Sequence, residues 1–219
     1  MYHLIVVLVV LIVVLIVWLR PGRPVTGFCS ADAPYTKPVV HDNIITPEES
    51  TYILETAGPM FSDSTVLSGK DNSIRKSETA WLKKSDPTVA GILKRLSERF
   101  NFDTTNAEDL QVVRYYPGGF YNEHHDSCCD DNQHCRDFVR NSGQRVLTIL
   151  IYLNDDFEGG YTNFKNLNLD LKANPRGGIV FHPLQLGGKM CHPNALHKGT
   201  PVTSGVKYIC NVWVRERPF

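Results

Sequence analysis

The sequence predicts an α+β domain that is mainly β, an antiparallel β-sandwich with helices packed on one side. Two helical patterns, over residues 47–57 and 86–100, come early in the chain. Apolar, β-branched stretches separated by Gly- and Pro-rich segments then predict strands, at residues 110–116, 145–153, 177–181 and 206–214. A chain of 219 residues with 42% hydrophobic content suits one well-cored domain.

Start and stop signals justify both helices. Thr46 is a candidate N-cap with Pro47 in the first helical position, and Gly58 with Pro59 should end that helix. Asp86 opens the second helix, whose apolar residues recur at helical spacing and predict a core stripe: Val89, Ile92, Leu93, Leu96 and Phe100. Residues 62–77 are polar and predict a mobile loop, either a substrate lid or ordinary surface, before a strand at 78–82.

The N-terminus carries an uninterrupted apolar run over residues 4–19. At about 1.5 Å per residue, such a helix approaches the roughly 30 Å thickness of a bilayer core. We therefore expect a membrane anchor at 1–20, a linker at 21–40 and a catalytic domain at 41–219. Arg20 and Arg23 favour a cytoplasmic domain, whereas six cysteines favour the endoplasmic reticulum or secretory lumen. The expectation is a single-pass, lumen-facing protein.

Charge gives little information about partners. The 23 basic and 23 acidic residues balance, so no electrostatic argument points to nucleic acid. Acidic residues gather after position 122, namely Glu123, Asp126, Asp130, Asp131 and Asp137. They favour either a cationic peptide or a solvated acidic loop.

Metal-ligand residues follow the strand at 110–116. Because side chains alternate along a strand, His124 and Asp126 project to one face while His125 projects to the other. Two imidazoles and one carboxylate form the ligand set of non-haem Fe(II) oxygenases. His197 has the best sequence context for the second imidazole, compared with His182 and His192.

A cation is predicted beside this cluster. If residues 197–214 fold as a hairpin about Val202, His197 and Lys207 lie opposite one another, at roughly 5 Å between Cβ atoms. Lys207 would then bind the far carboxylate of a dicarboxylate co-substrate. Trp213 lies on the same strand face as Lys207 and should wall the pocket.

Three segments together resemble the prolyl 4-hydroxylases, which are Fe(II)- and 2-oxoglutarate-dependent dioxygenases. They are RYYPGGFYNEHHD, GQRVLTILIYLNDDFEGGYTNF and LHKGTPVTSGVKYICNVW. The resemblance covers residues 47–214 and is closest to small plant, algal and viral members. It implies a double-stranded β-helix, or jelly roll, and the use of Fe(II), 2-oxoglutarate, dioxygen and ascorbate.

The resemblance also implies roles for individual residues. His124, Asp126 and His197 correspond to iron ligands and Lys207 to the carboxylate-binding lysine. Further residues correspond to hydroxyl donors to that carboxylate, Tyr115 and Thr162, and to a substrate-facing arginine, Arg145. The implied substrate is a proline-rich peptide or protein hydroxylated on carbon 4 of proline; another protein hydroxylase, of lysine for example, is the alternative. Tyr161 stands where the family has Glu, and the loop after Asp126 is longer.

The cysteines allow a different interpretation. His124, His125 and His134 lie near Cys128, Cys129 and Cys135, and imidazole with thiolate suits zinc, so a zinc-stabilised binding module without enzymatic activity is the alternative. Adjacent cysteines lack the usual C-x-x-C spacing, and thiolates beside an oxidising iron are easily oxidised. Disulfides are therefore favoured. The sequence leaves open both their pairing and the oligomeric state of the protein.

Overall fold

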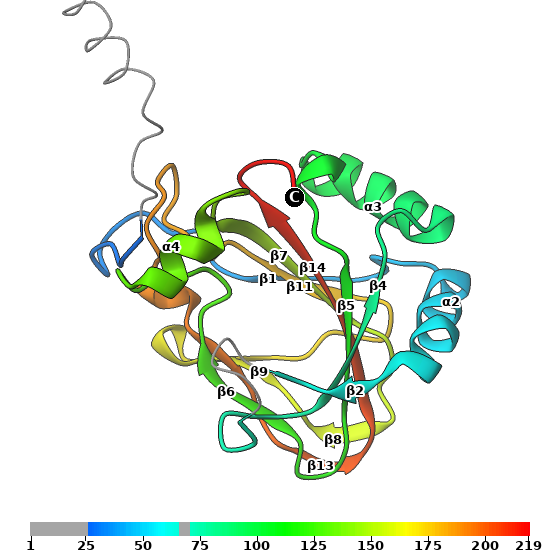
Figure 1. The fold of residues 1–219 in the computed structure, drawn as a ribbon. Helices are drawn as coiled ribbons and strands as arrows, with labels where there is room; N and C mark the ends of the chain where they lie inside the picture. Colours follow the sequence, from blue (N-terminus) through cyan, green and yellow to red (C-terminus); the bar gives the residue numbers. More distant parts are fainter. Residues whose placement is uncertain (1–25, 66–70) are drawn as a thin grey trace, which may run out of the picture.

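The computed structural model describes residues 26–65 and 71–219. Within these ranges the chain forms two facing antiparallel sheets with its two longer helices on one side (Figure 1), which confirms the predicted fold class. The larger sheet has the order β1 (Val39–His41), β11 (Gly178–Phe181), β7 (Arg145–Tyr152), β14 (Lys207–Arg215), β5 (Leu110–Tyr115), β4 (Glu78–Leu82) and β2 (Ser62–Asp63).

The smaller sheet has five strands and carries two of the candidate metal ligands. Its order is β10 (Leu169–Leu171), β9 (Thr162–Phe164), β12 (His197–Gly199), β6 (Phe120–His124) and β3 (Arg75–Lys76). A separate ribbon pairs β13 (Val202–Gly205) with β8 (Phe157–Gly159). The short helix α4 (Gln133–Val139) follows β6, and 3₁₀ turns occur at Gly58–Met60, Thr104–Asn106, Lys165–Leu167 and Pro193–Ala195.

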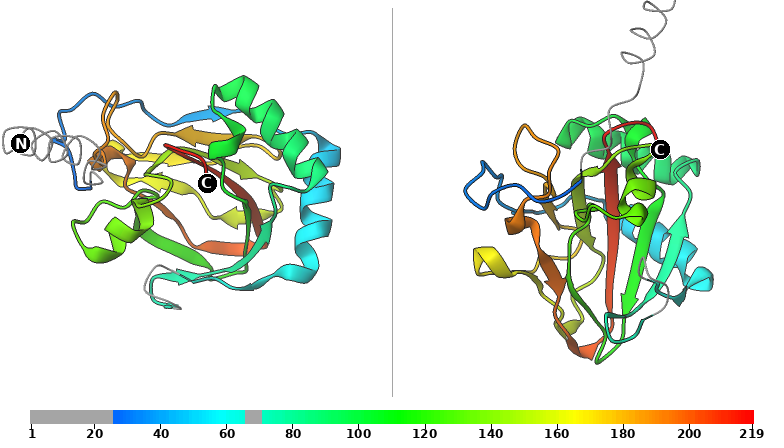
Figure 2. Two further views of the ribbon diagram at one scale, coloured as in Figure 1. Left: turned by 45° about the horizontal axis from the view of Figure 1, so that its top comes forward. Right: turned by 60° about the vertical axis from the view of Figure 1, so that its left-hand side comes forward.

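Both early helices form where the sequence predicts them. In α2 (Pro47–Ala57) the Thr46 side chain accepts from the Glu49 backbone N–H, while the Glu49 carboxylate accepts from the Thr46 N–H. In α3 (Pro87–Phe100) the Asp86 carboxylate accepts two backbone bonds. These bonds satisfy N–H groups that have no partner within a helix. Figure 2 shows both helices on the outer face of the larger sheet.

Two cores explain why β7 is apolar at nearly every position. Ile149 and Ile151 pack toward α2 and α3, whereas Leu150 and Tyr152 face the smaller sheet. Successive side chains of a strand point to opposite faces, so a central strand buried on both sides needs a continuous apolar run. Side chains on the inner face of this sheet therefore lie opposite the candidate metal ligands.

The predicted hairpin between His197 and Lys207 is wrong. β12 pairs with β6 and β9 in the smaller sheet, whereas β14 pairs with β5 and β7 in the larger one. The intervening β13 pairs with β8 and ends at Gly205, whose φ is +71°. A Cβ there would meet the Asp156 carbonyl oxygen at 2.1 Å, so glycine permits the chain to cross between sheets. His197 and Lys207 are thus on facing sheets.

The predicted localisation is also corrected. Within residues 26–65 and 71–219, we find no helix with the length and apolar character needed to cross a membrane. The described residues therefore give no support to a membrane-anchored, lumen-facing protein or to a membrane partner. The apolar run at 4–19, on which that prediction depended, lies outside the described residues.

The remaining predicted segments are partly described. From position 26 the expected linker contacts the domain: the Cys29 N–H donates to the Cys191 carbonyl, and Tyr35 stacks on His192. The expected loop at 62–77 contains β2 and β3 at its ends, and β3 pairs with β6 beside the site. Its residues 66–70 are outside the described ranges.

Candidate active site

Three side chains converge at one end of the space between the sheets. His124 ends β6, Asp126 follows two residues later, and His197 begins β12, where it pairs directly with His124. Their ligand atoms all lie within 4.8 Å of one another. Asp126 Oδ1 is 3.7 Å from His124 Nε2 and 3.9 Å from His197 Nε2. One cation between them would complete this arrangement.

Backbone carbonyls orient both imidazoles for metal binding. His124 Nδ1 lies 2.8 Å from the Asn122 oxygen, and His197 Nδ1 lies 3.0 Å from the Ala195 oxygen. A carbonyl only accepts, so each Nδ1 carries the proton and each Nε2 presents a lone pair toward Asp126. This donor set, with one carboxylate and two oriented imidazoles, fits Fe(II).

Burial sets the charge of the cluster. It lowers the pKa of His124 well below its ordinary value, with His197 contributing further, so that ring is neutral and able to ligate. Burial raises the pKa of Asp126, but His197, His124 and Arg145 outweigh it and bring the value to about 2. The carboxylate is therefore ionised at neutral pH.

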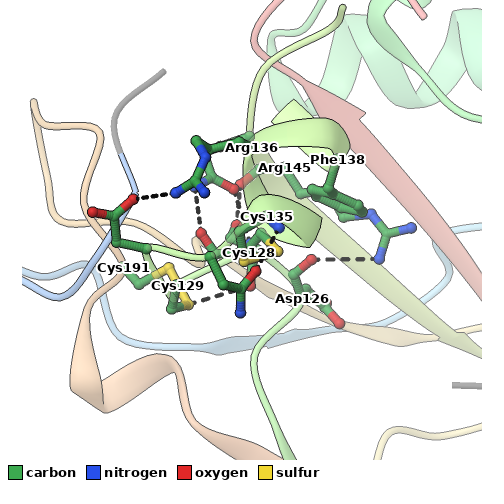
Figure 3. Close-up of a disulfide and its surroundings, with 12 residues drawn as sticks. Asp126, Cys128, Cys129, Cys135, Arg136, Phe138, Arg145 and Cys191 are labelled. Atoms are coloured by element: carbon green, nitrogen blue, oxygen red, sulfur yellow. Dashed lines mark hydrogen bonds and ion pairs between the residues drawn. A yellow bond between two sulfur atoms is a disulfide. The ribbon is translucent and has the colours of Figure 1, made fainter. Parts of the chain in front are cut away.

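The disulfides contradict the zinc alternative. Cys128 bonds to Cys135, and Cys129 bonds to Cys191 (Figure 3), so these four sulfurs offer no thiolate to a metal. Cys29 and Cys210 are free within the described residues. The second disulfide joins the loop that follows Asp126 to the segment that leads to His197, and the covalent links therefore support the cluster rather than compete with it.

A small pocket beside the cluster carries a buried cation. It is lined by Lys207, Tyr115 and Thr162 together with His197 and Trp213. Lys207 is 3% exposed, and its ammonium donates to the Gly160 carbonyl at 2.6 Å. Burial, with some repulsion from Lys172, lowers the pKa of Lys207 to about 7. A buried ammonium is costly without a counter-ion, so this pocket suits the far carboxylate of a short dicarboxylate.

Tyr152 supports two residues of this pocket from behind, and the sequence analysis missed it. Its ring centroid lies 4.7 Å from the Lys207 ammonium, and its hydroxyl is 3.0 Å from the Thr162 hydroxyl. In the sequence it belongs to the apolar run that predicts a strand at 145–153. A buried tyrosine hydroxyl needs a hydrogen-bond partner, so a tyrosine within an apolar run could have pointed to a polar contact at this position.

A larger cavity opens on the other side of the cluster. Its volume is about 350 Å³, and its wall includes the aromatic side chains Trp81, Tyr121, Phe138 and Trp213 with His125 and Arg145. Trp213 lines both this cavity and the Lys207 pocket, and Arg145 lines this cavity. Arg145 also pairs with Glu108, and its guanidinium lies 3.5 Å from the Trp213 ring centroid.

Two further residues of this region were missed. Tyr121 stacks on His124 with ring centroids 3.6 Å apart, and the Arg75 guanidinium lies 4.7 Å from the centroid of the Tyr121 ring. Tyr121 stands in the motif quoted above, three positions before His124. Arg75 belongs to the segment that the sequence analysis treated as a loop, where no pattern marked it.

Comparison with known proteins agrees with this geometry. The profile of the 2OG-Fe(II) oxygenase superfamily matches residues 110–215. A putative prolyl 4-hydroxylase of Acanthamoeba polyphaga mimivirus is 48% identical over 192 residues, covering 88% of this chain and 79% of that protein. Prolyl 4-hydroxylase 1 of Arabidopsis thaliana is 31% identical over 200 residues, covering 82% and 68% respectively.

A solved structure gives the same result. The viral collagen prolyl hydroxylase of Paramecium bursaria Chlorella virus 1, in complex with 2OG, aligns with a TM-score of 0.66 and 26% identity over 82% of this chain and 96% of that one. The fold and the site thus define a 2OG-Fe(II) oxygenase with a jelly-roll core. Within that class the chain belongs to the prolyl 4-hydroxylase family and is a dioxygenase of that type. The family implies Fe(II), 2-oxoglutarate and dioxygen.

Proposed function

We propose that this protein hydroxylates carbon 4 of proline residues within proline-rich peptides or proteins. The reaction would require Fe(II), consume 2-oxoglutarate and dioxygen, and release succinate and carbon dioxide. The observation that carries the proposal is the position of the His-Asp-His cluster between two cavities of different character. One is small and holds a buried ammonium, and the other is larger and lined by aromatic rings.

Each side of the cluster has its own task. His124, Asp126 and His197 would hold the iron, which together with 2-oxoglutarate and dioxygen would supply the oxidation of the substrate C–H bond. Lys207 would hold the far carboxylate, with hydroxyl groups of Tyr115 and Thr162 lining the same pocket. Because Lys207 lies on the facing sheet, it fixes the direction in which the co-substrate enters the cluster.

The larger cavity would bind the peptide. Trp81 is 40% exposed and its ring lies 6.1 Å from that of Trp213, so apolar aromatic surface continues from the rim toward Asp126. Proline-rich chains already favour the extended polyproline II form, which docks on aromatic surfaces at a low entropic cost. Arg145 on this wall would orient the peptide. Ascorbate would serve as the reductant that restores Fe(II) after turnover without substrate.

Peptide length tests this proposal. We expect no hydroxylation of free proline, slow hydroxylation of a single-proline peptide and the fastest hydroxylation of a proline-rich repeat, measured by mass spectrometry with succinate release in parallel. A set of otherwise identical peptides with lysine in place of proline is the control. Oxygen on lysine, or free proline as the best substrate, would show that the substrate assignment is wrong.

A further inference from the structure

The two oxygens of Asp126 have different surroundings. Oδ1 faces the two imidazole Nε2 atoms. Oδ2 points the other way, where the Thr148 hydroxyl donates to it at 2.6 Å and the Trp213 indole N–H donates to it at 3.1 Å. All three side chains are buried, at 8%, 1% and 6% exposure for Asp126, Thr148 and Trp213. Hydrogen bonds to an ionised group in such a place are strong ones.

Both donors come from the larger sheet, although Asp126 belongs to the other side of the sandwich. Thr148 lies on β7 and Trp213 on β14, and they are direct partners in the register of these two strands. Partners across an antiparallel pair have their side chains side by side on one face. Asp126, by contrast, follows the end of β6 and lies in no strand. The two hydrogen bonds therefore tie a loop-borne carboxylate to the central strands of the opposite sheet.

Further contacts hold the indole in place. The Arg145 guanidinium lies over the Trp213 ring at 3.5 Å, and Glu108 accepts from both Nε and Nη2 of Arg145 at 2.7 and 2.8 Å. Glu108 also pairs with Arg215, two residues beyond Trp213 on β14. A guanidinium held by a two-pronged carboxylate has little rotational freedom, so the ring that it covers keeps its orientation.

We propose that Thr148 and Trp213 are positioning residues that restrict Asp126 to one metal bond. With Oδ2 engaged by two donors, only Oδ1 is free to face a cation, so Asp126 would occupy one coordination position instead of two. The position that is kept open is one that the co-substrate or dioxygen requires. Trp213 would thus both line the peptide cavity and orient Asp126, and Thr148 would orient Asp126. The inference rests on the proposed iron chemistry.

Metal binding tests the proposal without turnover. Thr148→Val keeps the shape of the side chain but removes the donor, and we expect its Mn(II) affinity, measured by titration calorimetry, to fall by about 10- to 100-fold, as is usual when a partner of a ligand is lost. Thr148→Ser keeps the hydroxyl and should stay within about threefold of the parent. The visible d–d absorption of the Co(II)-loaded Thr148→Val protein should also change, since it reports coordination number.

Matched controls separate this effect from a general loss of packing. Ser50→Ala removes another buried hydroxyl, bonded to the Leu153 carbonyl, and should leave Mn(II) affinity unchanged. Trp213→Phe removes the indole donor to Asp126 and should weaken Mn(II) binding.

Unchanged Mn(II) affinity and Co(II) absorption in a folded Thr148→Val protein would overturn the proposal. If that variant does not fold, Trp213→Phe decides, and parental affinity there has the same consequence. Failure of the peptide assay with Mn(II) binding still dependent on Thr148 would refute the proposed substrate and leave this inference standing.

Discussion

The metal cluster and the Lys207 pocket lie side by side but are built in different ways. The polar groups of the pocket lie within strand ladders: Lys207, the first residue of β14, pairs with Tyr115, the last residue of β5, and Thr162 begins β9 in the smaller sheet. The cluster takes its ligands from strand ends and, for Asp126, from a loop. Backbone ladders thus hold these polar groups of the pocket, whereas in the cluster Asp126 depends on side-chain hydrogen bonds and the loop after it on two disulfides. Local substitutions should therefore disturb metal binding more than carboxylate binding.

Removal of a metal ligand should have the largest effect. His124→Ala, Asp126→Ala and His197→Ala each take away one of only three protein ligands, and we expect 2-oxoglutarate turnover to fall below detection. Succinate release measured with saturating Fe(II) checks this. His182→Ala is the matched control, because His182 is exposed and bonded to the Val146 carbonyl, and it should remain active. Full activity in any of the three ligand variants would contradict the assignment.

Sequence reasoning found the residues of the cluster because their spacing carries the information. His124 and Asp126 are two residues apart, and strand alternation predicted that they share a face, although β6 ends at His124 and Asp126 lies in the loop that follows. His197 and Lys207 were found as well, but their relation was wrong, since strand spacing does not reveal which sheet a strand joins. Gly205 allows the chain to cross between the sheets. A glycine is needed there because a side chain would collide with the Asp156 carbonyl oxygen, which is distant in the sequence.

Residues whose role depends on tertiary contacts escaped the sequence analysis. Thr148 and Tyr152 stand in an apolar run, and only the packing of the two sheets shows that their hydroxyls meet Asp126 and Thr162. The disulfide pairing was open for the same reason, because a bond between Cys129 and Cys191 spans 62 positions. The oxidised state itself was predictable from the presence of cysteines beside an oxidising site.

Loss of the Cys129–Cys191 disulfide should have the next largest effect. The bond closes a segment of 62 residues, and loop-closure entropy gives about 4 kcal/mol of stability for that length. The Cys128–Cys135 bond spans 7 residues and gives about 2 kcal/mol. Urea unfolding of the Cys129→Ala, Cys191→Ala double variant and of the Cys128→Ala, Cys135→Ala double variant measures both.

Two further measurements test whether the Cys129–Cys191 disulfide supports the metal cluster and not the Lys207 pocket. Cys29→Ser, which alters a free cysteine, should stay within about 0.5 kcal/mol of the parent. The Cys129→Ala, Cys191→Ala protein should lose Mn(II) affinity but keep its 2-oxoglutarate affinity at saturating Mn(II). Equal losses at both ligands would mean that the two regions are not supported independently.

Lys207→Met should weaken 2-oxoglutarate binding by about 100-fold, as expected for a buried charge-assisted bond. Mn(II) affinity should stay within about threefold, because no metal ligand is lost. Lys165→Met is the control: that lysine is exposed, pairs with Glu123 and should change neither affinity. Titration calorimetry gives both constants. A large loss of Mn(II) affinity in Lys207→Met would show that the pocket and the cluster are one cooperative unit.

The pH dependence of 2-oxoglutarate binding should show the smallest effect. Burial lowers the pKa of Lys207 to about 7, so above that pH most of the free protein holds a neutral amine. A bound carboxylate favours the ammonium and raises this pKa again, which couples binding to the uptake of one proton. Affinity should therefore be level below about pH 7 and fall by about tenfold for each pH unit above it, until the pKa of the complex is reached.

Binding at saturating Mn(II) between about pH 6 and about pH 8.5 measures this slope, and calorimetry in buffers of different ionisation enthalpy counts the proton. Lys207→Met removes the titrating group, so its weaker binding should be level over the same range. A parental affinity that stays constant or rises above pH 7 would contradict the prediction, because it would mean that Lys207 is already charged before the carboxylate arrives. The pocket would then hold its ammonium through protein groups alone, and the contrast with the metal cluster would be larger than we propose.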